Sequence, residues 1–341
     1  MSSRTTTAGS DLGPRRMHPV ALIASLLAVM VPTMSFFSVN VALGEIGRSL
    51  DASAGVLQLV VAAYGVMYAA LIIVAGRLGD GYGRKRALLA GLALFAATSL
   101  WCALAQGPTQ LVVARFVQGL AGALVTPQVL ATIHASTDGH HRERSIAWYG
   151  AAVGLATSLA FLLGGGLTSS ALGWRSVFWV NTPLALLVMA AVAYYLPETK
   201  APSRDPLDLV GAALLGTAMT LLVLPLTVGR PLGWPAWAWA CLVGFVAASI
   251  ALAAWQARLQ HRGEWPLVPP ALFRLRSMVV GLAVAVPLFV AFGGFMFIYS
   301  LRRRPACRRC GSAPACSRCR WRSSSPRSWP AGSCPGWGRA C

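Results

Sequence analysis

The sequence predicts an all-α protein that crosses a membrane many times. Of its 341 residues, 56% are hydrophobic and 11% are charged, and the mean hydropathy is +0.61. A soluble globular domain carries roughly 25% charged residues, so most segments of this chain have no polar face to turn to water. Apolar runs of about the length that one bilayer crossing requires, roughly 20 residues, recur along the chain. This pattern excludes an ordinary water-soluble enzyme.

Nine apolar runs succeed one another along the chain. They lie near residues 20–43, 57–78, 88–106, 111–133, 146–169, 177–196, 208–229, 236–256 and 278–300. Each is expected to be a helix, because lipid offers no hydrogen-bond partners to the open edge of a strand. The first run follows Arg15 and Arg16, as the core of a signal peptide would. It is too long for that role and no small-x-small cleavage site follows it, so an uncleaved first helix is predicted.

The positive charge of the chain is unevenly distributed. The formal net charge is +19, but ten of the 29 basic residues fall in the last 40 positions. The other nineteen share the rest of the chain with all ten acidic residues, which leaves a net charge of about +9 there. Short cytoplasmic loops of a membrane protein account for such an excess. The charge therefore indicates a lipid bilayer as partner, and no nucleic acid.

Lysine and arginine also predict the orientation of the helices. If the N-terminus is cytoplasmic, the loops on that side hold fourteen basic residues, whereas the opposite loops hold only Arg48, Arg175 and Arg230. Cytoplasmic loops are the ones enriched in these residues. The sequence therefore predicts a multi-pass protein of the cell (inner) membrane with its N-terminus in the cytoplasm.

The most informative stretch lies between the second and third apolar runs. It reads GRLGDGYGRKR over residues 76–86, and its glycines permit a tight reversal of the backbone. The acid within it can form an ion pair with the basic cluster at the membrane surface. The spacing resembles the motif A loop of the major facilitator superfamily. This resemblance implies a gate loop made by Gly76, Asp80, Gly83, Arg84, Lys85 and Arg86. The alternative is an ordinary loop that is basic because it is cytoplasmic.

Further stretches are similar to the same family. Residues 111–119 (LVVARFVQG) resemble its motif B, which places an arginine in the fourth helix. Residues 173–183 (GWRSVFWVNTP) resemble the entry to the sixth helix in the fourteen-helix drug:proton antiporter branch, and Pro197-Glu198, 207–211 and 266–273 follow in matching order. The resemblance covers about residues 20–300. It implies the major facilitator superfamily fold with an incomplete C-terminal half, truncated after the ninth helix.

The resemblance also implies a division of the chain. A cytoplasmic N-terminal segment (1–19) is expected to precede the six-helix transport half (20–196). The two linking helices (197–257), the first helix of the C-terminal half (258–301) and an aberrant tail (302–341) are expected to follow.

Two charged residues are candidates for coupling transport to proton movement. Arg115 would lie within the fourth helix, where a charge costs about 2.5–3.5 kcal/mol at mid-bilayer; it either faces a polar pathway or reaches back to the interface. Asp208 precedes the seventh run and is either a proton site or a partner for the dipole of that helix. Ser35 stands where drug-exporting members of the family often carry an acid. Serine cannot take up a proton near neutral pH, as a desolvated carboxylate can.

Polar residues within the apolar runs are candidates for lining a substrate cavity between helices one, two, four and five. These are Asn40, Tyr64, Gln118 and Gln128. In the fifth run, Gly150, Gly154 and the run Gly164-Gly165-Gly166 resemble the antiporter motif C only in part, because Ala160-Phe161 stands where a Gly-Pro pair is expected. Close helix packing is the alternative role for these glycines.

The last 40 residues differ from the rest of the chain. Residues 302–341 contain no Asp, Glu, Lys, Ile, Leu, Val, Met or Phe, so they can neither cross a membrane nor build a core and are expected to be disordered. Two Cys-x-x-Cys pairs suggest zinc, but five residues separate them against roughly 15–20 in known sites, so no metal is predicted. An RNA-binding tail is disfavoured by its outward location. A frameshift just after Leu301 accounts best for the composition.

Two functions remain open at this point. The first is proton-driven export of small, amphipathic or cationic molecules such as drugs, by two pseudo-symmetric halves that rock around a midplane site. The second is a truncated fragment without transport activity, because alternating access needs both halves. An enzyme is not expected, since no nucleophile–base or metal constellation exists outside the tail. No cofactor is expected either.

Overall fold

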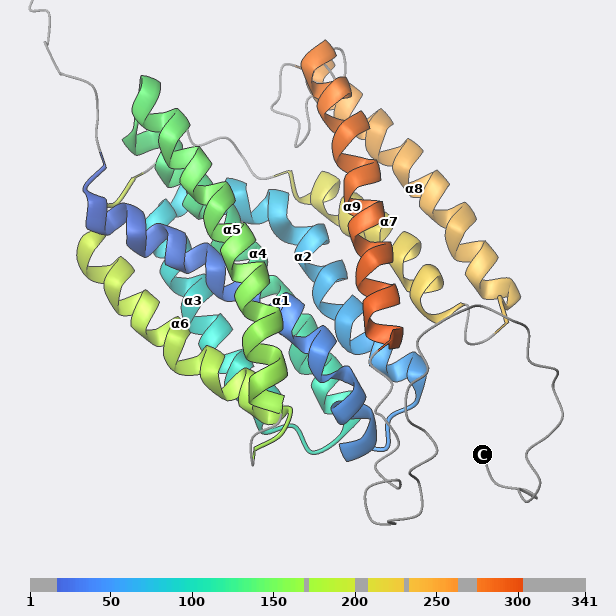
Figure 1. Cartoon of the computed structure of the whole chain (residues 1–341). Coiled ribbons are helices and arrows are strands. Elements are labelled where there is room, and N and C mark those ends of the chain that lie inside the picture. Colours follow the sequence, from blue (N-terminus) through green and yellow to red (C-terminus); the bar gives the residue numbers. More distant parts are fainter. Residues whose placement is uncertain (1–16, 169–171, 200–207, 230–232, 263–274, 303–341) are drawn as a thin grey trace, which may run out of the picture. The chain divides into compact units, whose positions relative to one another are not determined.

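The computed structural model describes residues 17–168, 172–199, 208–229, 233–262 and 275–302. This described part consists of nine α-helices and contains no strand (Figure 1). The helices are α1 (Pro19–Ser49), α2 (Ala54–Tyr82), α3 (Arg84–Ala103), α4 (Pro108–Ser136), α5 (Gly139–Thr168), α6 (Arg175–Tyr195), α7 (Leu209–Val228), α8 (Ala236–His261) and α9 (Arg276–Arg302). Each predicted apolar run is thus confirmed as a helix.

Length and composition allow seven of the described helices to cross a membrane. These are α1 to α6 and α8, whereas the stretches of α7 and α9 that were searched, Val210–Leu226 and Arg276–Ala291, are shorter apolar helices. Several helices extend beyond the apolar run that predicted them. The start of α5 is the clearest case, because the polar turn from Gly139 to Ser145 is helical although it is not hydrophobic. Hydropathy marks only the part of a helix that lipid would surround.

Local sequence explains where several helices begin. Pro19 and Pro108 occupy the first turns of α1 and α4, where the missing N–H of proline is not needed. The Ser53 side chain accepts a hydrogen bond from the Val56 N–H (3.5 Å) at the start of α2. Asp208 caps α7 by accepting from the Gly211 N–H (2.7 Å).

Helices α1 to α6 pack against one another in a bundle. Helix α4 lies alongside α2 and α3, α6 lies alongside α3 and α1, and α5 packs on α1. Helix α7 packs against α8 and α2. All of these contacts belong to one compact unit, residues 1–288, and the second unit begins at Phe289 within α9. The predicted tail (302–341), except for Arg302, lies outside the described residues, as do positions 1–16 of the predicted N-terminal segment.

Two apolar clusters fill the interior of the bundle. One contains Val31 of α1, Ala96 of α3 and Ala121 of α4, and the other contains Val39 of α1 and Cys102 of α3. Helices α1 and α3 each contribute to both clusters. The buried residues between these positions include polar ones, Ser35 and Ser38 on α1 and Thr98 and Ser99 on α3.

Candidate functional site

The α2–α3 junction forms a compact polar site at one end of the bundle. Gly83 separates the two helices with φ +113°, a backbone conformation that residues with a side chain rarely adopt. Its N–H still donates to the Gly79 carbonyl (2.9 Å), and its own carbonyl accepts from the Ala87 N–H (3.0 Å). One glycine thus ends α2 and starts α3 without a loop.

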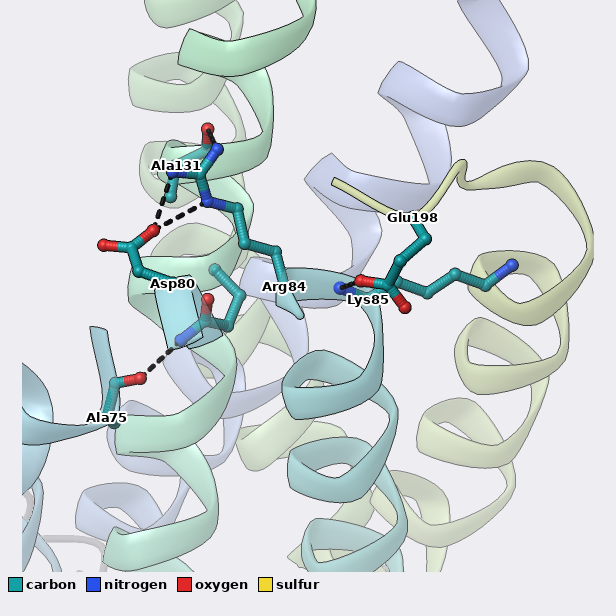
Figure 2. Close-up of polar contacts among 7 residues, drawn as sticks. Ala75, Asp80, Arg84, Lys85, Ala131 and Glu198 are labelled. Atoms are coloured by element: carbon teal, nitrogen blue, oxygen red, sulfur yellow. Dashed lines mark hydrogen bonds and ion pairs between the residues drawn. The ribbon is translucent and has the colours of Figure 1, made fainter. Parts of the chain in front are cut away.

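Asp80 and Arg84 form the ion pair that the sequence predicts. Arg84 donates through Nε (2.9 Å) and Nη2 (2.7 Å) to Oδ1 of Asp80. Its Nη1 donates to the Ala131 carbonyl of α4 (3.2 Å), as Figure 2 shows. The pair therefore connects the end of α2, the start of α3 and the last turns of α4. Of the other predicted loop residues, Gly76 packs on α4, because a methyl group there would lie 3.7 Å from Cβ of Pro127.

Glu198 completes the junction from the segment after α6. Its Oε1 accepts from the Lys85 N–H (3.2 Å), as Figure 2 shows. Its Oε2 lies 3.7 Å from Nε of Arg86. A Cβ atom on Gly83 would lie 2.6 Å from Oε1 of Glu198, so the glycine also makes room for this carboxylate. Glu198 is a site residue that was not predicted from the sequence. The Pro197-Glu198 match was the only signal for it, and nothing in the sequence joined it to a loop more than one hundred residues earlier.

Gln128 belongs to this end of the bundle. Its Nε2 donates to the Ala75 carbonyl of α2 (2.6 Å), a contact drawn in Figure 2. The side chain lies directly against Gly79, where a Cβ atom would overlap it. The structure therefore separates Gln128 from the other proposed cavity residues.

A second polar site lies between the two apolar clusters. It consists of Ser35, Tyr64, Ser99, Arg115 and Gln118, and we call it the arginine layer. Tyr64 is 3% exposed and the other four are fully buried. Helices α1, α2, α3 and α4 each contribute to it. Sequence reasoning had identified Tyr64, Arg115 and Gln118 separately, and the structure brings them together.

Arg115 stands at the centre of the arginine layer. Its Nη1 donates to Oε1 of Gln118 (2.7 Å) and to the Ser35 hydroxyl (3.5 Å), and its Nε donates to the Val60 carbonyl (3.3 Å). The guanidinium carbon lies 4.4 Å from the centre of the Tyr64 ring, a cation–π contact. The buried Nη2 has no hydrogen-bond partner. Arg115 therefore does not reach back to the interface; its head group is enclosed by neutral partners.

The remaining members of the arginine layer also form hydrogen bonds. Gln118 donates through Nε2 to the Ser99 hydroxyl (2.8 Å), and the Tyr64 hydroxyl donates to the Pro32 carbonyl (3.4 Å). Asn40 is only half-buried and donates to the Phe36 carbonyl of its own helix (3.1 Å). It lies on α1 one turn beyond Phe36, outside the arginine layer.

Asp208 has a structural role in this conformation. Besides capping α7, its Oδ1 accepts from Nε1 of Trp255 (3.0 Å) and its Oδ2 accepts from Nε2 of Gln256 (2.8 Å). Both oxygens are engaged, and they join the start of α7 to the last turns of α8. This geometry favours the helix-partner role over that of a proton site.

Among the α5 glycines proposed for close packing, Gly164 makes such a contact. A methyl group on Gly164 would lie 3.3 Å from the Ser38 carbonyl of α1. Gly150 and Gly154 have no described neighbour within 4 Å of that position.

The sequence as a whole decides the family. The profile of the Major Facilitator Superfamily matches residues 25–314. The chain belongs to the Major Facilitator Superfamily. It is therefore a multi-pass membrane protein of a transporter family rather than of an enzyme family. The profile extends thirteen residues beyond Leu301, where the resemblance noted in the sequence stopped.

Relatives of this chain include proteins named for antibiotic transport or for drug resistance. The chain is 36% identical over 299 residues to the "Probable actinorhodin transporter" of Streptomyces coelicolor, covering 87% of this chain and 51% of the relative. It is 32% identical to the multidrug resistance protein Stp of Mycobacterium tuberculosis (83% and 52% covered). It is 33% identical to the lincomycin resistance protein of Streptomyces lincolnensis (87% and 60% covered). The chain spans about half the length of the curated relatives it matches.

Solved structures agree on the fold. A crystal structure of a mutant of the peptide transporter POT in complex with sulfate superposes on 71% of this chain and 53% of that protein, with a TM-score of 0.53 and 19% identity. At this identity the likeness concerns the fold alone.

Proposed function

We propose that this chain provides the N-terminal half and linking helices of an efflux transporter that exports small molecules or drugs in exchange for protons. Residues 20–196 would be the transport half, 197–257 the two linking helices and 258–301 the first helix of the C-terminal half. The N-terminus would be cytoplasmic in the cell membrane, which places the α2–α3 junction at the cytoplasmic surface.

One observation carries this proposal, the fully buried Arg115 in a bundle of membrane-spanning helices. An ionisable residue inside a membrane is costly, and it usually faces a substrate or ion pathway. Arg115 donates to two residues of the arginine layer, Ser35 and Gln118, and to the Val60 carbonyl, and only the bond to Gln118 is short. The three drug- and antibiotic-related relatives support export as the direction of transport.

The proposed coupling ion is the proton, by the resemblance to drug:proton antiporters. Ser35 cannot carry it, so the proton must bind elsewhere than at this position of α1. The junction formed by Asp80, Arg84 and Glu198 would act as the cytoplasmic gate, since it fixes the ends of α2 and α3 with contacts that are polar and breakable.

Export by this chain would need a second half. Alternating access in this fold depends on two pseudo-symmetric halves that rock against each other. The chain spans 51% of the S. coelicolor relative, and this observation favours the second candidate function, a fragment that is inactive by itself.

Efflux assays separate the two functions. The 341-residue chain is expressed in cells depleted of drug pumps, alone or fused after Ser300 to the C-terminal half of the S. coelicolor relative. We call this fusion the complemented transporter. Energised efflux of fluorescent dyes is expected from the complemented transporter, with loss when a protonophore collapses the proton gradient. The chain alone is expected to be inactive. Efflux that persists with the protonophore would contradict proton coupling, and no efflux from either form would contradict export.

A further inference from the structure

The arginine layer contains a cation without a counter-ion. Arg115 is fully buried, and no carboxylate of the described residues forms an ion pair with it. Burying an unpaired charge is strongly unfavourable, so buried charges in proteins are normally paired. The fold supplies only neutral acceptors here, and Nη2 lacks even one of these.

No acid of the six-helix bundle can serve as this counter-ion. Helices α1 to α6 contain three acidic residues, Glu45, Asp80 and Glu143. Glu45 lies ten residues beyond Ser35 on α1, about 15 Å along the helix axis. Asp80 is held by Arg84, and Glu143 lies in the second turn of α5, where it pairs with His140. The missing negative charge has to come from outside the bundle.

The surroundings of Arg115 are aromatic. Its guanidinium lies on the Tyr64 ring, which stacks against Tyr68 (centroids 6.0 Å apart, planes at 13°). Tyr64 also contacts Phe36 of α1 (5.4 Å), and Phe36 contacts Phe37 (5.1 Å). Phe36, Phe37 and Tyr68 are only half-buried. A row of aromatic rings therefore leads from a partly exposed surface to the unpaired cation.

The contacts that now hold the guanidinium are replaceable. Those with Ser35 and Val60 measure 3.5 and 3.3 Å, at the long end for hydrogen bonds. A carboxylate that approached Nη2 could replace them with shorter, charge-assisted bonds. The bond to Gln118 and the contact with Tyr64 would hold the side chain in place meanwhile.

We propose that the arginine layer binds an organic acid with an aromatic body, whose carboxylate is the counter-ion of Arg115 and whose rings pack along Phe36, Tyr64 and Tyr68. The inference rests on the proposed function, since rocking of the two halves would open the buried layer. It names the substrate class of that function as anionic, where sequence analysis had favoured amphipathic or cationic compounds.

Binding to the purified complemented transporter in lipid nanodiscs tests the proposal. Isothermal titration calorimetry compares 2-naphthoate with the matched neutral 2-naphthamide and the cationic 2-naphthylmethylammonium. The acid is expected to bind about tenfold more tightly than the amide, the effect of one charge-assisted hydrogen bond. The cation is expected to bind more weakly than either. Equal binding of acid and amide, or a preference for the cation, would overturn the proposal.

Variants test whether Arg115 causes the preference for the acid over the amide. Arg115→Gln should abolish the preference for the acid. Arg175→Gln is the matched control, because Arg175 also lies over an aromatic ring (Trp174, 4.5 Å) and donates to a backbone carbonyl, and it should keep the preference. Ser35→Asp supplies an internal carboxylate beside Nη1 and should abolish the preference while the chain unfolds at a higher temperature. If Arg115→Gln does not fold, Ser35→Asp decides: an unchanged preference in that variant contradicts the proposal.

A chloride titration distinguishes an organic acid from a small inorganic anion. At constant ionic strength, chloride is expected to leave naphthoate binding unchanged, since it cannot use the aromatic row. Competition by chloride in the same concentration range as naphthoate would overturn the proposal. Intact naphthoate selectivity together with failed dye efflux would contradict only the proposed function.

Discussion

Gly119 of α4 lies directly against the backbone carbonyl of Tyr64 on α2. A Cβ atom on Gly119 would overlap this oxygen and lie 3.1 Å from Cβ of Met67. The missing side chain lets the two helices approach closely beside the arginine layer, as small residues do in membrane helix pairs. The contact between Arg115 and the Tyr64 ring depends on this approach.

Gly119→Ala is expected to destabilise the protein by about 1–3 kcal/mol, because backbone atoms cannot yield to the added methyl group as a side chain would. Thermal unfolding in detergent micelles measures the effect. Gly150→Ala is the control, since a methyl group there meets no described residue within 4 Å, and it should unfold at the wild-type temperature. Equal behaviour of the two variants would argue against close packing of α2 on α4.

Asp80→Asn is expected to lower efflux by the complemented transporter with little loss of stability. The Asp80 side chain is 38% exposed, and partly exposed pairs of this spacing contribute only about 0.3–0.5 kcal/mol. Asp138→Asn is a matched control, because Asp138 forms the same i,i+4 pair with Arg142 (2.9 Å) at the α4–α5 connection. Both variants should unfold near the wild-type temperature, and only Asp80→Asn should slow efflux. Similar efflux from the two variants would contradict a gate role for Asp80.

Glu198→Ala is expected to expose the start of α3 to exchange. The Lys85 N–H loses its acceptor and Arg86 loses its partner, so the Lys85 amide should exchange its hydrogen faster. Glu198→Gln retains an oxygen acceptor and should keep most of the protection. Hydrogen–deuterium exchange with mass spectrometry on peptides that contain residues 83–86 measures the difference. Protection unchanged in Glu198→Ala would mean that this carboxylate does not hold the junction.

Asp208→Ala is expected to cost about 1–3 kcal/mol, because it removes a helix cap and leaves two side-chain donors of α8 without their acceptor. Asp208→Asn keeps one oxygen that can accept from Gly211 and Trp255, so it should fall between the alanine variant and the wild type in thermal unfolding. Normal proton-driven efflux in Asp208→Asn would agree with the structural role. Complete loss of coupling in a stable Asp208→Asn protein would instead assign the proton to Asp208.

The helices could be predicted from sequence because lipid requires long apolar runs, and each predicted run lies in a helix. Their ends were harder to predict. Helix α5 begins at Gly139, seven residues before the run that predicted it, since a helix can continue into a polar turn where hydropathy gives no signal. Within one helix, neighbours also follow from spacing: Arg115 and Gln118 are three residues apart and share a face.

Contacts between helices that are distant in sequence could not be predicted in the same way. Ser99 bonds Gln118, and Gln128 lies against Gly79, because particular turns of α2, α3 and α4 lie at the same level of the bundle. A single sequence contains no information on those levels. It could therefore suggest that Arg115 lies inside the membrane, but not that its partners would all be neutral.

The segment after α6 is tied back to the α2–α3 junction by backbone as well as by Glu198. The Arg84 N–H donates to the Thr199 carbonyl (3.0 Å). The backbone at the start of α3 is therefore hydrogen-bonded to the backbone that follows α6. The exit of the chain from the six-helix bundle is thus anchored at the same point as the reversal at Gly83. A movement that opened this reversal would therefore also displace the segment that connects α6 to α7. A conformational change in the six-helix bundle would then reach α7 through the covalent chain as well as through helix contacts.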